Sequence, residues 1–235
     1  MSKVFIILIL VTQINYLYFS PAETIRSKNL KEKPKTNTER KLDDLSDDIV
    51  IIHLNDVHCG FNETIGYDGF VLYRRELESK YKNVIAVDSR DHIQGGVLGS
   101  ITEGEAVLEI INKIQFNVST IGNHEFDYGI EQLHNLNSNL LNKYICLNVF
   151  YKKNKTQIFE PSRIVEVGDK KIGFIGIVTP LTFSKTYIST VRESDGTPTY
   201  DFLSNKEELY STIQAEVDKI RNNGVNYVIL LTHVG

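Results

Sequence analysis

Side chains that commonly bind metals or transfer protons follow three predicted strands, at the point where each strand ends. In chain order these groups are Asp56 with His58, Asp88 with Asp91, and Asn123 with His124, Glu125 and Asp127. Ligands of open α/β sheets bind outside the carboxyl ends of the strands, so the three groups are expected to share one edge. Carboxylates and imidazoles together suit a divalent cation. The pattern therefore predicts a metal site, although any one group alone fits an ordinary cap or loop hydrogen bond.

A fourth predicted strand carries one more candidate. The apolar run 228–231 delivers His233 to the end of what reads as a buried strand. The other histidines fit the pattern less well. His53, within the first strand, and His134, on a helix, are interpreted as structural, whereas His92 lies close to the site but outside its pattern.

Apolar runs alternate with helical patterns beyond residue 48, which is typical of a layered α/β fold. The expected strands are 50–55, 84–87 and 118–121, and the expected helices are 69–82, 103–113 and 130–141. A hairpin is expected where 163–167 and 171–177 flank a Gly-Asp-Lys turn. Apolar residues then recur at helical spacing from Leu209 to Ile220, before the last strand.

The N-terminal residues predict a secretory signal peptide over residues 1–22. Lys3 precedes an apolar run, and Ser20 and Ala22 supply the small residues of a cleavage site after Ala22. Gln13 and Asn15 interrupt the apolar run well short of the roughly 20 residues that a membrane span needs. We therefore expect a secreted or extracellular protein without a membrane span in its mature form, with association to the cell surface left open. Residues 23–48 are almost wholly polar and predict a flexible linker.

Composition excludes one class of partner. The formal net charge is −4 and the pI about 5.9, so no basic stripe is available for a nucleic acid. Cys59 and Cys146 are the only cysteines, and both one bridge and two buried free thiols are compatible with them.

Several strings together resemble one family. "NDVH", the two aspartates about thirty residues later, "GNHEFDYG", "GFIGIVTP" and "LLTHVG" are similar to the metallophosphoesterase domain of secreted 5′-nucleotidases and related calcineurin-like phosphoesterases. The resemblance runs from about Asp48 to the last residue. It implies an αββα sandwich with mixed β-sheets, of which residues 49–235 are the N-terminal part.

The resemblance also implies a metal-dependent phosphoric ester hydrolase with two divalent cations, either zinc, manganese or cobalt. Asp56 and His58 would bind one cation, Asn123 and His233 the other, and Asp91 both. Such a pair lowers the pKa of a bound water and clamps phosphoryl oxygens. His124 would protonate the leaving group, and Asp127 would fix its tautomer. The expected substrate is a small phosphate ester, most simply a nucleoside 5′-monophosphate.

Two departures from the family pattern bear on activity. In the family a Gly-His-x-His-like element and a nucleotide-binding domain follow "THVG", and neither lies within these 235 residues, so we expect a C-terminally truncated domain. The second departure is Arg90, where the family usually has glycine. Its guanidinium would oppose the cations if it pointed inward and matter little if it reached water. A positive φ there would add backbone strain, which puts the role of Asp91 in question.

Two other interpretations stay open. A non-catalytic secreted remnant would bind metal weakly at one site or at none. A 2′,3′-cyclic-nucleotide phosphodiesterase or a nucleotide-sugar hydrolase would use the same metal cluster on a different ester.

Overall fold

The computed structural model describes residues 4–10, 46–61, 66–187 and 190–233. Strand β1 (Val4–Leu10) falls within the predicted signal peptide. The remainder of that peptide and residues 23–45 of the predicted linker lie outside the described residues, so both stay predictions. No described helix combines the length and the apolar composition that a membrane crossing requires.

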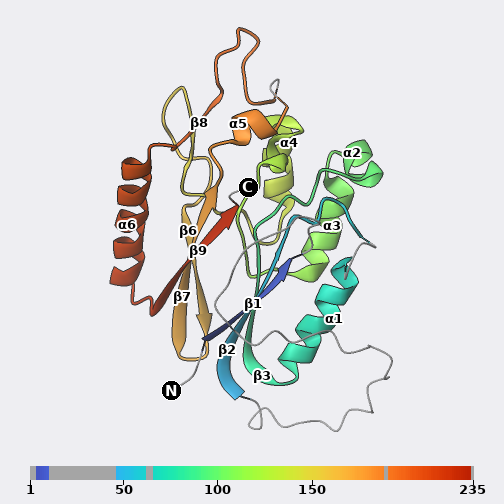
Figure 1. Cartoon of the computed structure of the whole chain (residues 1–235), viewed down its shortest axis with the longest axis vertical. Coiled ribbons are helices and arrows are strands. Elements are labelled where there is room, and N and C mark those ends of the chain that lie inside the picture. The colour runs from blue at the N-terminus through green and yellow to red at the C-terminus, as the bar shows by residue number, and fades with distance from the viewer. Residues whose placement is uncertain (1–3, 11–45, 62–65, 188–189, 234–235) are drawn as a thin grey trace.

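The first sheet is fully parallel. Three of the four strands that end at predicted metal ligands belong to it. Its strands, in spatial order, are β1, β2 (Ser46–Asn55), β3 (Tyr81–Asp88) and β4 (Val118–Ser119). Helices cover the outer face of this sheet, on the right of Figure 1. They are α1 (Gly66–Glu78), α3 (Glu105–Ile114) and α4 (Gly129–Asn139), with the short α2 (Val97–Thr102) beside α3.

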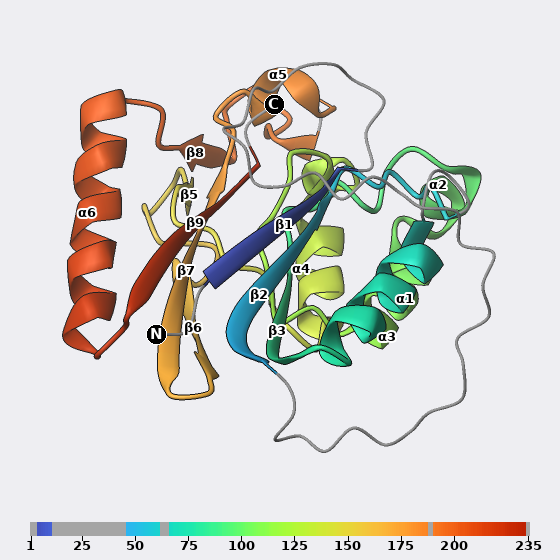
Figure 2. The same ribbon diagram turned by 60° about the horizontal axis from the view of Figure 1, so that its bottom comes forward.

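The second sheet is mixed and carries the fourth strand end. Strand β7 (Lys170–Val178) pairs antiparallel with β6 (Ser162–Val167) and parallel with β9 (Tyr227–His233). Helix α6 (Lys206–Asn222) covers its outer face, opposite the other helices (Figure 2). The connection from β7 to α6 contains the short helix α5 (Thr182–Lys185) and strand β8 (Tyr200–Phe202), which pairs with β5 (Val149–Tyr151).

The core confirms four layers, because three apolar clusters fill the three spaces between them. Alternate residues of β2 enter different clusters: Val50 and Ile52 face the helices, whereas Ile49 and Ile51 face the second sheet. The cluster between the sheets also includes Phe174 and Leu231, and a third cluster lies under α6. The expected αββα sandwich is therefore the observed fold.

Most element boundaries differ from the predicted ones by a few residues. Strand β2 begins at Ser46, within the predicted linker, because Ser46 pairs with Tyr81 and Lys82 forms an ion pair with Asp47. Short elements that were not predicted include α2, α5, β5, β8 and the 3-10 helix η2 (His124–Phe126). Cys59 and Cys146 are both buried free thiols, so the structure favours the second of the two cysteine alternatives.

Neighbouring leucines on β9 test the layer assignment. Leu231 is 4% exposed between the sheets, whereas Leu230 is 45% exposed. We expect Leu231→Ala to lower the free energy of unfolding by about 2–5 kcal/mol, because it removes buried methyl groups and leaves a cavity. Leu230→Ala is the matched control and should cost less than about 1 kcal/mol. Urea unfolding of both variants measures the difference, and equal losses would contradict the assignment.

Candidate metal centre

Two turns with left-handed backbone follow β2 and β3. Asp56, His58 and Cys59 have φ values of 54°, 47° and 58°, and Arg90 and Asp91 have values of 56° and 62°. This conformation costs an L-residue on the order of 1 kcal/mol or more, so the surrounding structure must hold it. Backbone hydrogen bonds do so: the amides of Asp56 and His58 donate to the carbonyls of Arg90 and Asp91, both at 2.8 Å.

The paired turns bring three predicted ligands together. Ligand atoms of Asp56, His58 and Asp91 all lie within 4.8 Å of one another. Nε2 of His58 is 3.9 Å from an oxygen of each carboxylate. Its Nδ1 lies 3.3 Å from Oε1 of Gln94, a contact that keeps Nε2 facing the carboxylates.

The turn after β4 is linked to the turn after β3 through carboxylates. Oδ1 of Asp91 accepts a hydrogen bond from the amide of His124 at 2.9 Å. The buried carboxylate of Glu125 accepts from the amides of Asp91 and His92, both at 3.1 Å, and of Gly122 at 2.9 Å. A Cβ on Gly122 would lie 2.2 Å from Oδ1 of Asp91, so only glycine fits there.

The sequence predicts no specific role for Glu125, yet its carboxylate connects the turns that follow β3 and β4. Burial, together with the charge of Asp91, raises the pKa of Glu125. The sequence placed Glu125 in the same string as the ligands, but nothing in it indicated that the carboxylate turns toward backbone amides.

His233 completes the cluster from the second sheet. Its Nδ1 donates to the carbonyl of Ser89 at 2.8 Å, which leaves Nε2 facing the other ligands. Nε2 lies 3.1 Å from Oδ2 of Asp91 and 3.1 Å from Oδ1 of Asn123. All five predicted ligands therefore lie together at one edge of the sandwich.

The donor set fits divalent cations. Carboxylate and amide oxygens combine here with imidazole nitrogens, a mixture that suits zinc, manganese or cobalt. The amide Nδ2 of Asn123 is buried without a hydrogen-bond partner among the described residues, and its Oδ1 faces the cluster. The side chains that could hold a metal are thus Asp56, His58, Asp91, Asn123 and His233.

Asp91 and His233 shift each other's pKa in opposite directions. Burial alone lowers the pKa of His233, but the hydrogen bond and charge of Asp91 raise it to about 9. Burial alone would raise the pKa of Asp91, whereas His233 and the amide of His124 lower it. Without a cation, the pair is therefore held together as an imidazolium and a carboxylate.

His124 stands beside the ligands and is held by a second carboxylate. Its Nδ1 is 2.7 Å from Oδ2 of Asp127, and its ring lies edge-on to that of His58, with 5.3 Å between centroids. The hydrogen bond to Asp127 raises the pKa of His124, against the opposing effect of burial. The other oxygen of Asp127 accepts a hydrogen bond from Oγ1 of Thr186, just after α5. Sequence reasoning missed Thr186, which lies in a polar connection without a motif.

The observed orientation of the Arg90 side chain is neither of the two expected from the sequence. Its side chain is fully buried, with Nε 2.9 Å from Oδ2 of Asp88 and the guanidinium 4.7 Å from the centre of the Tyr144 ring. It therefore neither points at the ligand cluster nor reaches water. The expected positive φ is present.

The remaining histidines have partners away from the ligands. His92 is buried, with Nε2 2.9 Å from Oδ1 of Asp88 and Nδ1 2.9 Å from the Tyr67 hydroxyl. His53 contacts the hydroxyl of Ser89 at 2.7 Å, and His134 contacts the hydroxyl of Tyr151. These contacts agree with structural roles.

Comparisons with known proteins agree with this fold. Residues 49–235 match the family model described as calcineurin-like phosphoesterase. The snake venom 5′-nucleotidase of Crotalus adamanteus is 31% identical over 206 residues, which cover 80% of this chain and 33% of that protein. A 2′,3′-cyclic-nucleotide 2′-phosphodiesterase/3′-nucleotidase of Salmonella typhimurium is 29% identical over 67% of this chain and 25% of its own length.

A solved structure has the same fold. The 5′-nucleotidase precursor of Thermus thermophilus superposes with a TM-score of 0.65 at 25% identity, over 79% of this chain and 37% of that one. The fold and the family model thus define the class of residues 49–235 as a calcineurin-like phosphoesterase domain. The chain belongs to the calcineurin-like phosphoesterase family, and it spans about a third of the length of the 5′-nucleotidases it matches.

The His233–Asp91 pair predicts a pH dependence of stability without metal. A histidine whose pKa rises from 6.5 to about 9 on folding contributes stability that is complete below pH 6.5 and lost as pH rises through 9. In EDTA, the free energy of unfolding should therefore fall between these values by as much as about 3 kcal/mol. Urea titrations across this range measure it. His233→Gln should remove most of the slope, and an unchanged slope would contradict the pairing.

Proposed function

We propose that the chain hydrolyses nucleoside 5′-monophosphates to nucleoside and phosphate with two divalent cations. The observation that carries the proposal is the convergence of five metal-type side chains from four strand ends. Asp56 and His58 would hold one cation, Asn123 and His233 the other, and Asp91 both. When bound, such a pair supplies a nucleophile from water and charge to stabilise the phosphoryl group.

The chain's own residues supply the proton for the leaving group. Because Nδ1 of His124 is hydrogen-bonded to Asp127, Nε2 of His124 is free to donate a proton to the leaving-group oxygen of the ester. The hydrogen bond to Asp127 raises the pKa of His124, which favours the protonated ring that a general acid requires. Asp127 fixes the tautomer and balances the imidazolium charge.

Two relatives support the substrate class without deciding the ester. One is named a snake venom 5′-nucleotidase and the other a 2′,3′-cyclic-nucleotide 2′-phosphodiesterase/3′-nucleotidase. A nucleoside monophosphate is thus the first substrate to test, and a cyclic nucleotide is the second candidate. The predicted signal peptide and the venom relative together support secretion.

Phosphate release from AMP in the presence of manganese, cobalt or zinc tests the activity. We expect His124→Ala to lower kcat by about 100-fold or more, because general acid catalysis contributes on that order. His134→Ala is the matched control, since His134 contacts Tyr151 and no ligand. Turnover that survives EDTA, or an active His124→Ala variant, would reject the mechanism. Calorimetric titration should also find two cations per chain, whereas a non-catalytic remnant would bind one weakly or none.

Thr186 offers a second test, of how Asp127 is held. Thr186→Val keeps the shape but removes the hydroxyl that donates to Asp127, so His124 loses its fixed orientation. We expect kcat for AMP to fall about 10-fold. p-Nitrophenyl phosphate has a leaving group that needs little protonation, so its kcat should change by less than about threefold.

The controls separate orientation of the acid from a general packing effect. Thr186→Ser should restore most of the AMP rate. Thr182→Val removes another buried hydroxyl of the same segment, one that donates to the carbonyl of Thr179, and should leave the ratio of the two rates unchanged. Equal losses on both substrates in Thr186→Val would contradict a role through His124.

A further inference from the structure

Arg90 is the bulkiest fully buried side chain among the described residues. A buried guanidinium is costly unless a counter-charge accompanies it. Asp88, also fully buried, supplies that charge: although burial acts the other way, Arg90 and His92 lower the pKa of Asp88 to about 2. The tyrosine ring of Tyr144 covers one face of the guanidinium.

The Asp88 carboxylate holds the residues on both sides of Asp91. Its Oδ1 accepts from the amide of Arg90 at 2.9 Å and lies 2.9 Å from Nε2 of His92, while its Oδ2 pairs with the Arg90 side chain. Asp91 therefore sits between two residues that share one anchor. A shift of either neighbour would turn the Asp91 carboxylate away from the ligand cluster.

Backbone contacts of the same turn reach ligands on other strands. The carbonyl of Ser89 accepts from His233, that of Arg90 from the amide of Asp56, and that of Asp91 from the amide of His58. Displacement of this turn would thus move ligands that arise from β2 and β9 as well. Its left-handed residues have no intrinsic preference for the conformation, so an external hold is needed.

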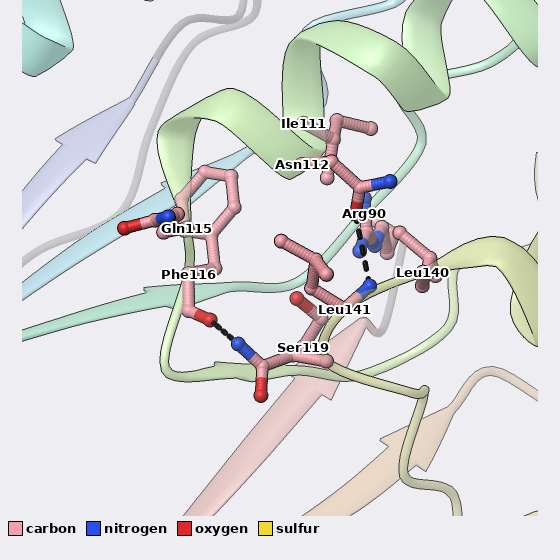
Figure 3. A pocket seen from close by; sticks show the side chains of 9 residues that line it. Arg90, Ile111, Asn112, Gln115, Phe116, Ser119, Leu140 and Leu141 are labelled. Carbon is pink, nitrogen blue, oxygen red and sulfur yellow. Dashed lines mark hydrogen bonds between the residues drawn. The ribbon is translucent and has the colours of Figure 1, made fainter.

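Figure 3 shows the residues that line a small pocket beside the Arg90 side chain. A pocket of about 10 Å³ lies beside Arg90, and exposed residues such as Gln115 and Leu141 line its outer part. Nε and Nη1 of Arg90 and the hydroxyl of Ser119 form no hydrogen bond with suitable geometry to any described residue. The guanidinium is therefore held by its charge contact with Asp88, at 2.9 Å, and by the ring of Tyr144 on its face.

We propose that Arg90 is a positioning residue for Asp91: its buried ion pair with Asp88 and its contact with Tyr144 lock the left-handed turn that carries the bridging carboxylate. The proposal rests on the metal-bridging role proposed above for Asp91. Arginine is an unusual residue at this position, because glycine adopts a φ of 56° more easily than arginine does. If the side chain were mere filling, Arg90→Gly would relieve strain and leave cation binding intact.

Hydrogen exchange of the metal-free chain tests the lock directly. The double variant Asp88→Asn with Arg90→Met removes the ion pair without leaving one charge alone. We expect the amides of His58, Asp91 and His92 to exchange at least about 10-fold faster than in the native chain, while amides in the middle of β7 stay unchanged. Unchanged exchange at the three turn amides would overturn the proposal.

Calorimetric titration with cobalt tests the consequence for the cations. Arg90→Gly and the double variant should bind cobalt about 10- to 100-fold more weakly, the usual loss when a residue that orients a ligand is removed. Arg90→Lys should recover only part of the affinity, because an ammonium cannot pair with Asp88 and cover Tyr144 in the same planar way. Arg163→Met, a half-buried arginine of β6, is the matched control and should bind as the native chain does.

Native affinity in Arg90→Gly would overturn the proposal. Absence of cobalt binding by the native chain would instead reject the two-metal function, and the exchange measurement would still decide whether Arg90 locks the turn. The two failures are therefore distinguishable.

Discussion

The candidate metal centre depends on one backbone constraint, the pairing of two left-handed turns where β2 and β3 end. The strands are parallel neighbours with Leu54 opposite Asp88, so their exits begin side by side. Hydrogen bonds between the turns extend the ladder beyond the strands and offset the strain of the positive φ values. Main-chain hydrogen bonds between the two turns consequently help to bring Asp56, His58 and Asp91 together.

The carboxylates at this edge have separate partners, and this separation lets several of them lie close together. Asp91 faces His233 and lies near Asp56 and His58. Asp88 is matched by Arg90 and His92. Glu125 accepts hydrogen bonds from three backbone amides. Each carboxylate is thus balanced by a cationic group or by N–H donors, which limits the repulsion that acidic groups in one site would otherwise produce.

The sequence predicted what is local or periodic, and it did not predict contacts between distant loops. Apolar runs placed the strand ends, and because parallel strands end at one edge, the convergence of Asp56, Asp91 and Asn123 could be expected from the order of residues alone. The direction of Arg90 could not, since it depends on Tyr144, 54 residues away in the chain, and on the space under α3. Thr186 shows the same limit: it lies 59 residues from Asp127, and α5, which brings it there, has no clear periodicity.

Exposure of the ligands determines the side from which a substrate reaches the cluster. The side chains of Asp91 and His233 are 3% and 6% exposed and form its floor, whereas those of His58 and His124 are 36% and 25% exposed. The exposed side of the cluster is thus formed by these two rings, together with Asp56, whose side chain is 23% exposed. In the proposed mechanism a phosphate ester would approach from this side, and His124 would meet the leaving alcohol next to solvent. The asymmetry of burial, more than the identity of the side chains, supports the acid role proposed for His124.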